Sequence, residues 1–304
     1  MSALNIIHLL IFAFLYKTSA VLDGDDVRWI RHRWIVKVMA KNPEGNAHSC
    51  TGSMISQSLV LTAAECVVQR STRARMEEFV VILPKVGSHK RHFGELSVGT
   101  TKIAQYKFSE GHLLELSQEW ALLRIQPLDI NDICPKEDRD LKGILRLNLK
   151  PSLLAPSLFE VTPATIKESD CYLYGFETTE NAIGFLKQKI LRRIDMEKPV
   201  DHPENEGYLR SRIIGNNTAC FEDTGAALIC RVHQHGFLHV GIFQSLSFPQ
   251  SDVNQNFNRT SMNMCYAAHS MEFSINTADE QLVEAINRYA LAEFVAVYAA
   301  CEFI

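Results

Sequence analysis

The sequence predicts an all-β globular protein, a sandwich or barrel, that ends in one helix. Short apolar segments recur between turn residues, and they are rich in β-branched and aromatic side chains. These segments include residues 34–39, 59–62, 79–83, 121–125 and 238–243. Of the 304 residues, 46% are hydrophobic and 22% are charged, which excludes a disordered chain, a collagen-like repeat and a coiled coil.

The N-terminus predicts export. Residues 9–15 form an apolar run too short to span a bilayer, and small residues end at Ala20. We expect residues 1–20 to be a signal peptide, with a signal anchor or a buried strand as the alternative. The mature chain is then secreted and extracellular, without a membrane contact. Two N-x-[ST] sequons, at Asn216 and Asn258, predict glycosylation of surface loops.

The net charge, a connecting segment and a helix-capping motif characterise the rest of the chain. The formal net charge is −4, so nucleic acid is not an expected partner. A connection at residues 138–154 is the predicted boundary between two halves. Thr277 and Glu280 form a capping box that predicts an amphipathic helix over residues 278–299. We expect this helix to pack on the body of the protein; the alternative is a helix presented to a partner.

Several segments resemble, in family order, the trypsin-like serine proteases of the chymotrypsin fold, peptidase family S1. They are Cys50–Ser56 with Val60–Cys66, Glu119–Leu123 and Cys220–Leu228, with two further strands at Cys171–Phe176 and Val240–Phe243. The resemblance covers nearly all of residues 21–275. It implies two antiparallel six-stranded β-barrels within one homology domain, residues 21–304, with the C-terminal helix. The barrels are expected at about residues 30–138 and about residues 155–276.

The eight cysteines are even in number, as in a secreted domain with a few disulfides. The resemblance implies the pairs Cys50–Cys66, Cys171–Cys230 and Cys220–Cys265. Cys134 and Cys301 remain, either as a fourth disulfide or as two free thiols.

The catalytic triad is changed at every position that the resemblance implies. Glu65 stands in place of the histidine, Glu119 in place of the aspartate and Thr224 in place of the nucleophilic serine. A carboxylate with an ordinary pKa of about 4.3 is a poor base for a hydroxyl at neutral pH. A second carboxylate at Glu119 would raise the pKa of Glu65 by repulsion, without supplying an imidazole.

The resemblance also implies a degenerate oxyanion site and substrate pocket. Glu222 stands in place of the glycine that donates to the oxyanion, where a carboxylate opposes the developing negative charge. Thr218 stands at the base of the primary pocket. Gln244, Ser245 and Leu246 replace the residues that bind the substrate backbone.

The acidic positions Glu65, Glu119 and Glu222 allow three interpretations: a relic cleft, a cation site, or a proton-sharing dyad with residual hydrolase activity. We expect the relic cleft, with no cofactor and no metal. Histidines 233, 235 and 239 are read as exposed hairpin residues, with a metal cluster as the alternative.

Val21 begins a segment that resembles the start of an activated family member. The resemblance implies that its α-amino group pairs with Asp223; the alternative is a frayed terminus. Together these features predict a secreted, catalytically inactive protease homologue that regulates an extracellular proteolytic pathway as a cofactor or decoy. Its expected partner is a protease, a protease substrate or an inhibitor. The alternatives are residual or altered hydrolase activity, and a glycan- or cation-binding module.

Overall fold

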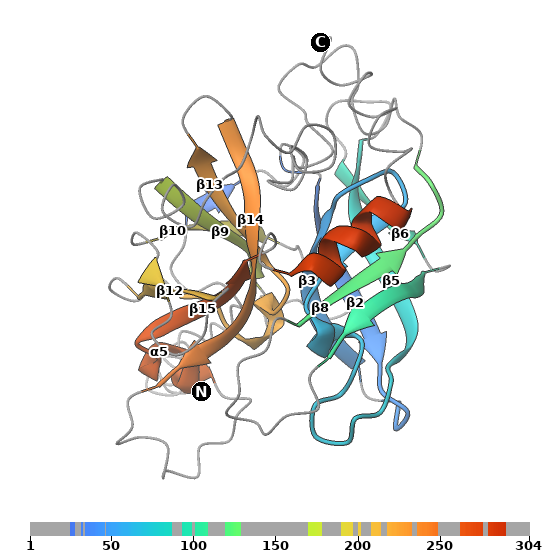
Figure 1. Cartoon of the computed structure of the whole chain (residues 1–304), viewed down its shortest axis with the longest axis horizontal. Coiled ribbons are helices and arrows are strands. Elements are labelled where there is room, and N and C mark those ends of the chain that lie inside the picture. The colour runs from blue at the N-terminus through green and yellow to red at the C-terminus, as the bar shows by residue number, and fades with distance from the viewer. Residues whose placement is uncertain are drawn as a thin grey trace, which may run out of the picture.

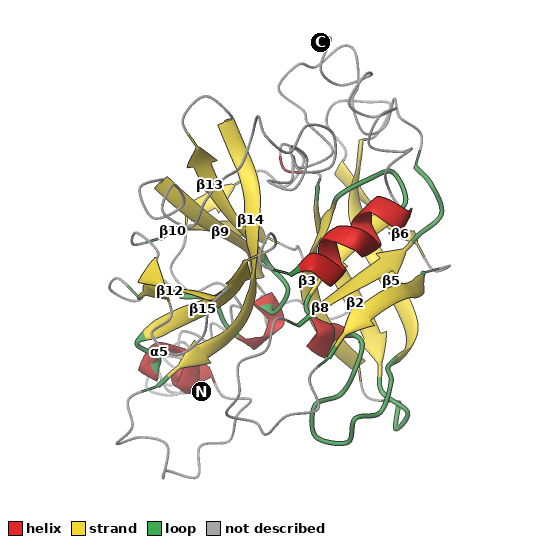
Figure 2. Ribbon diagram, in the orientation of Figure 1, coloured by secondary structure: helices red, strands yellow, loops and turns green. Residues whose placement is uncertain are grey.

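Two curled antiparallel β-sheets lie side by side in the computed structural model (Figure 1), and short helices and loops connect their strands (Figure 2). The structure describes residues 25–27, 32, 34–45, 47–86, 93–98, 101–108, 119–128, 170–177, 190–196, 200–201, 208–213, 218–232, 236–248, 262–275 and 279–289.

The first sheet has seven strands in the order β6-β5-β2-β3-β4-β8-β7. They are β2 (Ile35–Lys41), β3 (Ala47–Met54), β4 (Leu59–Thr62), β5 (Glu77–Val86), β6 (Phe93–Val98), β7 (Lys102–Lys107) and β8 (Trp120–Arg124).

The second sheet has eight strands in the order β1-β10-β9-β13-β14-β15-β12-β11. They are β1 (Asp25–Val27), β9 (Asp170–Glu177), β10 (Ile190–Asp195), β11 (Val200–Asp201), β12 (Tyr208–Arg212), β13 (Ala227–Val232), β14 (Gly236–Ser247) and β15 (Ser270–Ile275). The N-terminal strand β1 therefore pairs with the second half of the chain, along β10.

The predicted fold class is confirmed. The apolar segments of the sequence analysis all fall on strands, because β-branched and aromatic side chains suit a half-buried pleated surface. The first sheet has six strands in addition to the terminal strand β6. In the second, six strands lie between the short end strands β1 and β11.

Buried apolar side chains form two main clusters. One fills the first sheet and continues into the second through Tyr174, Phe176 and Ile229. The other lies within the second sheet, where Phe243 and Phe273 pack with their ring centroids 5.7 Å apart. Because the first cluster crosses between the sheets, the loops at their junction have a rigid support.

The C-terminal helix is described over residues 280–289 and lies across the first sheet (Figure 1). Its apolar face, including Leu282 and Ile286, is buried in the first cluster, so the helix packs on the body of the protein as predicted. The predicted cap is corrected: Asp279 caps the helix. Its Oδ1 accepts hydrogen bonds from the backbone N–H of Gln281 at 2.9 Å and of Leu282 at 3.1 Å.

Three disulfides join the described cysteines, and they are the three predicted pairs: Cys50–Cys66, Cys171–Cys230 and Cys220–Cys265. The first ties β3 to the 3-10 helix η2 (Ala64–Cys66). The third ties the segment before the 3-10 helix η4 (Phe221–Asp223) to helix α5 (Met262–Ala267). Cys134 and Cys301 lie outside the described residues.

Candidate functional site

The three predicted triad positions lie on or directly beside short elements at the junction of the two sheets. Glu65 belongs to η2, which the Cys50–Cys66 disulfide holds against β3. Glu119 directly precedes β8, and its side chain is only 3% exposed. Thr224 follows η4 and is 7% exposed. The backbone oxygen of Thr224 lies 3.6 Å from Sγ of Cys66, so the third position adjoins η2.

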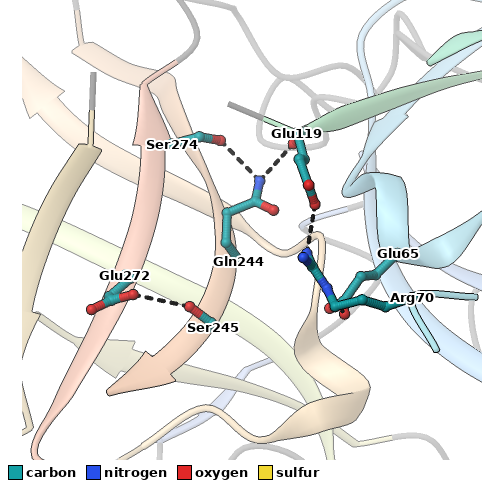
Figure 3. A network of polar contacts seen from close by, with 7 residues as sticks. All are labelled: Glu65, Arg70, Glu119, Gln244, Ser245, Glu272 and Ser274. Atoms are coloured by element: carbon teal, nitrogen blue, oxygen red, sulfur yellow. Dashed lines mark hydrogen bonds and ion pairs between the residues drawn. The ribbon is translucent and has the colours of Figure 1, made fainter. Parts of the chain in front are cut away.

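An arginine joins the two glutamates (Figure 3). Nε of Arg70 donates to Oε1 of Glu65 at 2.6 Å, and its Nη2 donates to Oε2 of Glu119 at 2.6 Å. The guanidinium also lies 5.4 Å from the ring centroid of Phe108, within the range of a cation–π interaction. Glu65 and Glu119 are therefore brought together, with a cation between them.

The turn after η2 places this arginine. Val68 and Arg75 form an isolated antiparallel bridge, and the turn that they close carries Arg70. Burial alone would lower the pKa of Arg70, but the carboxylates of Glu65 and Glu119 raise it above its ordinary value. The guanidinium stays charged at any pH at which the protein is folded.

Glu119 is fixed through its backbone as well. Nε2 of Gln244 donates to the backbone oxygen of Glu119 at 2.7 Å and to Oγ of Ser274 at 2.9 Å (Figure 3). The side-chain amide of Gln244 thus links both sheets at the point where Glu119 enters β8.

Burial raises the pKa of Tyr208, and the charge of Glu119 raises it further, so the phenol stays protonated.

Residues of the first sheet hold the loop around Thr224, and we call this group of contacts the interbarrel clasp. It consists of Lys37, Thr51, Glu222 and Thr224. Lys37 and Thr51 face each other across β2 and β3. Nζ of Lys37 lies 3.4 Å from Oε2 of Glu222, and Oγ1 of Thr51 donates to the backbone oxygen of Glu222 at 3.4 Å. The backbone N–H of Thr51 donates to the backbone oxygen of Thr224 at 3.0 Å.

Gly225 permits this close approach. Its φ is +88°, a conformation that disfavours other residues. A Cβ at this position would lie 2.3 Å from the backbone oxygen of Thr51 and 2.1 Å from Oγ1 of Thr62. The loop of the second sheet therefore touches the backbone of the first directly.

Asp223 is fully buried next to this clasp. Its Oδ2 accepts from the backbone N–H of Cys220 at 2.9 Å, whereas Oδ1 has no hydrogen-bond partner among the described residues. Burial, as the largest cause, raises the pKa of Asp223 to about 8. The predicted partner Val21 lies outside the described residues, so the ion pair stays a prediction.

The predicted pocket residues are engaged in contacts within the protein. Thr218 is fully buried and donates to the backbone oxygen of Ala219 at 3.0 Å. Oγ of Ser245 donates to Oε2 of Glu272 at 3.0 Å (Figure 3). Leu246 packs against the Cys220–Cys265 disulfide and the core of the second sheet. Gln244, as described above, bonds to Glu119.

Sequence reasoning missed Arg70, Lys37 and His48. A physical signal was present for the two cations, because carboxylates that come together need counter-ions wherever they are buried. His48 of β3 stands near two acids: burial lowers its pKa, while Glu65 and Glu222 oppose that shift. None of these three residues belongs to a family motif, so the resemblance gave no reason to single them out.

Several predicted features lie outside the described residues: the signal peptide, the boundary at residues 138–154, the sequon residues Asn216 and Asn258, and histidines 233 and 235. Thr218 of the first sequon is described and is fully buried. The expectation that His239 is exposed is wrong: it is fully buried in β14, and burial lowers its pKa to about 3. Within the described ranges, no group of three or more His, Cys, Asp and Glu side chains could hold a metal ion. No described helix is long and apolar enough to cross a membrane.

The comparison with known families agrees with this architecture. The model of the family described as Trypsin matches residues 21–257 of the chain. The matched stretch contains every strand of the first sheet, η2, η4 and all the site residues up to Leu246. The chain therefore belongs to the trypsin family.

Proposed function

We propose that this protein is a catalytically inactive member of the trypsin family that acts by binding. One observation carries the proposal: a guanidinium, not an imidazole, bonds to the carboxylate of Glu119 and to Glu65. The family's reaction needs a group that takes a proton from the nucleophile and later returns it. An arginine cannot be deprotonated in a protein, so Arg70 cannot take that role.

The nucleophile position supports the same conclusion. Thr224 has a hydroxyl, but its methyl group crowds the line of attack and its side chain is nearly buried. Glu65 stands at the position of the family's base, and its Oε1 is already bound to Arg70. The carboxylate of Glu222, on the same loop as Thr224, would oppose an oxyanion forming there.

The substrate-binding positions favour loss of turnover too. The amide of Gln244 is committed to Glu119 and Ser274, and Thr218 is fully buried. A substrate would have to displace these contacts before it could pair with this segment. We therefore propose that partners bind through surfaces around the cleft and not as substrates within it.

The partner is an extracellular protein. The proposed signal peptide and the disulfides suit an oxidising compartment. Within that compartment we propose a role as cofactor or decoy toward a protease, a protease substrate or a protease inhibitor.

Labelling with a fluorophosphonate probe tests the loss of catalysis. The purified secreted protein should remain unlabelled and should not cleave a mixed peptide library, while an active trypsin-family protease run in parallel reacts in both assays. Peptide turnover that disappears in a Thr224→Ala variant would overturn the proposal. Crosslinking in the native fluid, followed by mass spectrometry, tests the partner. A protease, substrate or inhibitor linked near the cleft is expected, and no reproducible protein partner would contradict it.

A further inference from the structure

The guanidinium of Arg70 is held on three sides. Its Nε and Nη2 bond to two different carboxylates, each at 2.6 Å, and the ring of Phe108 covers one face. Such a planar, multiply bonded cation is fixed in position, because each contact restricts a different part of the group.

Glu119 depends on this cation. Its side chain is 3% exposed, and a buried carboxylate is stable only with a charged or strongly hydrogen-bonded partner. Tyr208 faces Glu119 from the second sheet, where Glu272 is also near, and His48 stands beside Glu65 and Glu222. Among these neighbours only Arg70 brings a permanent positive charge.

We propose that Arg70 is an internal plug: it occupies the Glu119 carboxylate from within the chain, so a histidine restored at position 65 cannot pair with Glu119 while Arg70 is present. A working imidazole must donate its Nδ1–H to this carboxylate while its Nε2 faces the nucleophile. Arg70 bonds to Glu65 through Nε and to Glu119 through Nη2, so its guanidinium lies between the two side chains, where that imidazole would have to stand. Arg70 then adds to the inactive state from outside the triad positions.

Two variants test this inference: Glu65→His, and Glu65→His combined with Arg70→Gln. The pKa of the introduced imidazole is measured by NMR titration, and the native histidines are identified in the parent spectrum. In Glu65→His we expect an ordinary imidazole pKa of about 6.5 or lower, because Arg70 retains Glu119. In the double variant we expect a pKa about one pH unit higher or more, because Arg70 no longer bonds to the carboxylate or stands between it and the imidazole.

An equal pKa in both variants, or a pKa already raised in Glu65→His, would overturn the plug. A second measurement covers the case in which the double variant does not fold. The side-chain NMR signals of Arg70 in the unmodified protein should show slow exchange and hindered rotation, both lost in the isosteric Glu119→Gln variant. A freely rotating Arg70 in the unmodified protein would also overturn it. Neither readout uses activity, so the plug can fail while the proposed absence of catalysis stands.

Discussion

Nη2 of Arg70 and Oε2 of Glu119 lie 2.6 Å apart, although the two residues are 49 positions apart in the chain. The arginine is partly exposed and the carboxylate is buried, so the pair lies between solvent and the core. Substitution of Arg70 therefore changes a partly exposed side chain, but its main effect on stability falls on the buried carboxylate of Glu119.

Replacing Arg70 by glutamine should destabilise the protein by about 3 kcal/mol, since it leaves the buried Glu119 carboxylate without its cation. Urea unfolding measures the change. Lys41→Gln is the matched control, because Lys41 pairs with Glu78 on the surface, where an ion pair contributes about 0–1 kcal/mol. A second substitution, Glu119→Gln, should restore part of the stability lost with Arg70. A loss no larger than that of the control would contradict the role assigned to the pair.

Gly225→Ala should cost more than about 3 kcal/mol or prevent folding, because its Cβ would overlap the backbone of Thr51 and the side chain of Thr62. Gly45→Ala provides the comparison. Gly45 has a similar φ of +83°, with no atom within 4 Å of an added Cβ, so it carries the backbone cost of about 1 kcal/mol alone. Thermal unfolding of both variants measures the difference. Equal losses would show that the close approach at Gly225 contributes nothing.

Asp279→Ala should lower the free energy of unfolding by about 2 kcal/mol. The change removes the cap of the C-terminal helix and the acceptor for Nζ of Lys107 at 2.6 Å and Nε1 of Trp120 at 3.2 Å. Asp279→Asn keeps one oxygen for the cap but places an NH2 group against the donors of Lys107 and Trp120, so it should cost less than Asp279→Ala without being neutral. Glu280→Gln, at an exposed neighbour, is the surface control. Chemical unfolding followed by tryptophan fluorescence measures all three, and identical losses for Ala and Asn would argue against the cap.

The free energy of unfolding should fall as pH rises from about 6.5 to about 8. Burial raises the pKa of Asp223 from 3.8 to about 8. Between these values the folded protein keeps a proton that the unfolded chain has released. Asp223 therefore lowers the free energy of unfolding by up to about 1.4 kcal/mol per pH unit, and this effect ends above the folded pKa. Below about pH 6.5 the buried His239, whose pKa is lowered to about 3, contributes the opposite slope. Asp223→Asn should remove this component in urea titrations at several pH values.

The same titration distinguishes the two states predicted for the N-terminus. If the α-amino group of Val21 pairs with Asp223, a chain that starts at Val21 has a lower Asp223 pKa and a flatter profile. A chain with one additional residue before Val21 should keep the steep profile. Equal profiles would contradict the predicted ion pair. N-terminal sequencing of the secreted protein identifies which chain occurs naturally.

The arrangement of strands and disulfides could be predicted because it depends on patterns that are local or belong to the family. Residues 59–62 are apolar and β-branched, and they form β4. Cys50 and Cys66 lie in recognisable segments, and they pair as expected. The helix cap was misplaced by two residues because Thr277 and Asp279 are both good capping residues, and the choice depends on Lys107 and Trp120 in distant strands.

The ion pairs could not be predicted in the same way. The positions of Glu65 and Glu119 followed from the family resemblance, but their partner Arg70 lies in a turn whose path depends on a single bridge. Lys37 occurs within an apolar strand, where the sequence shows no partner, and its contact with Glu222 spans 185 positions. Contacts of this kind follow from the packing of one sheet on the other, which a pattern along the chain does not record.

The interbarrel clasp explains why a match to the family sequence can indicate the fold without indicating the reaction. Thr51 binds the backbone at Thr224, and Gly225 fits only because it has no side chain. These contacts stabilise the folded protein whether or not the site cleaves a peptide bond. A family match over this stretch is therefore evidence of architecture, and the chemistry must be judged from the side chains at Glu65, Glu119 and Thr224.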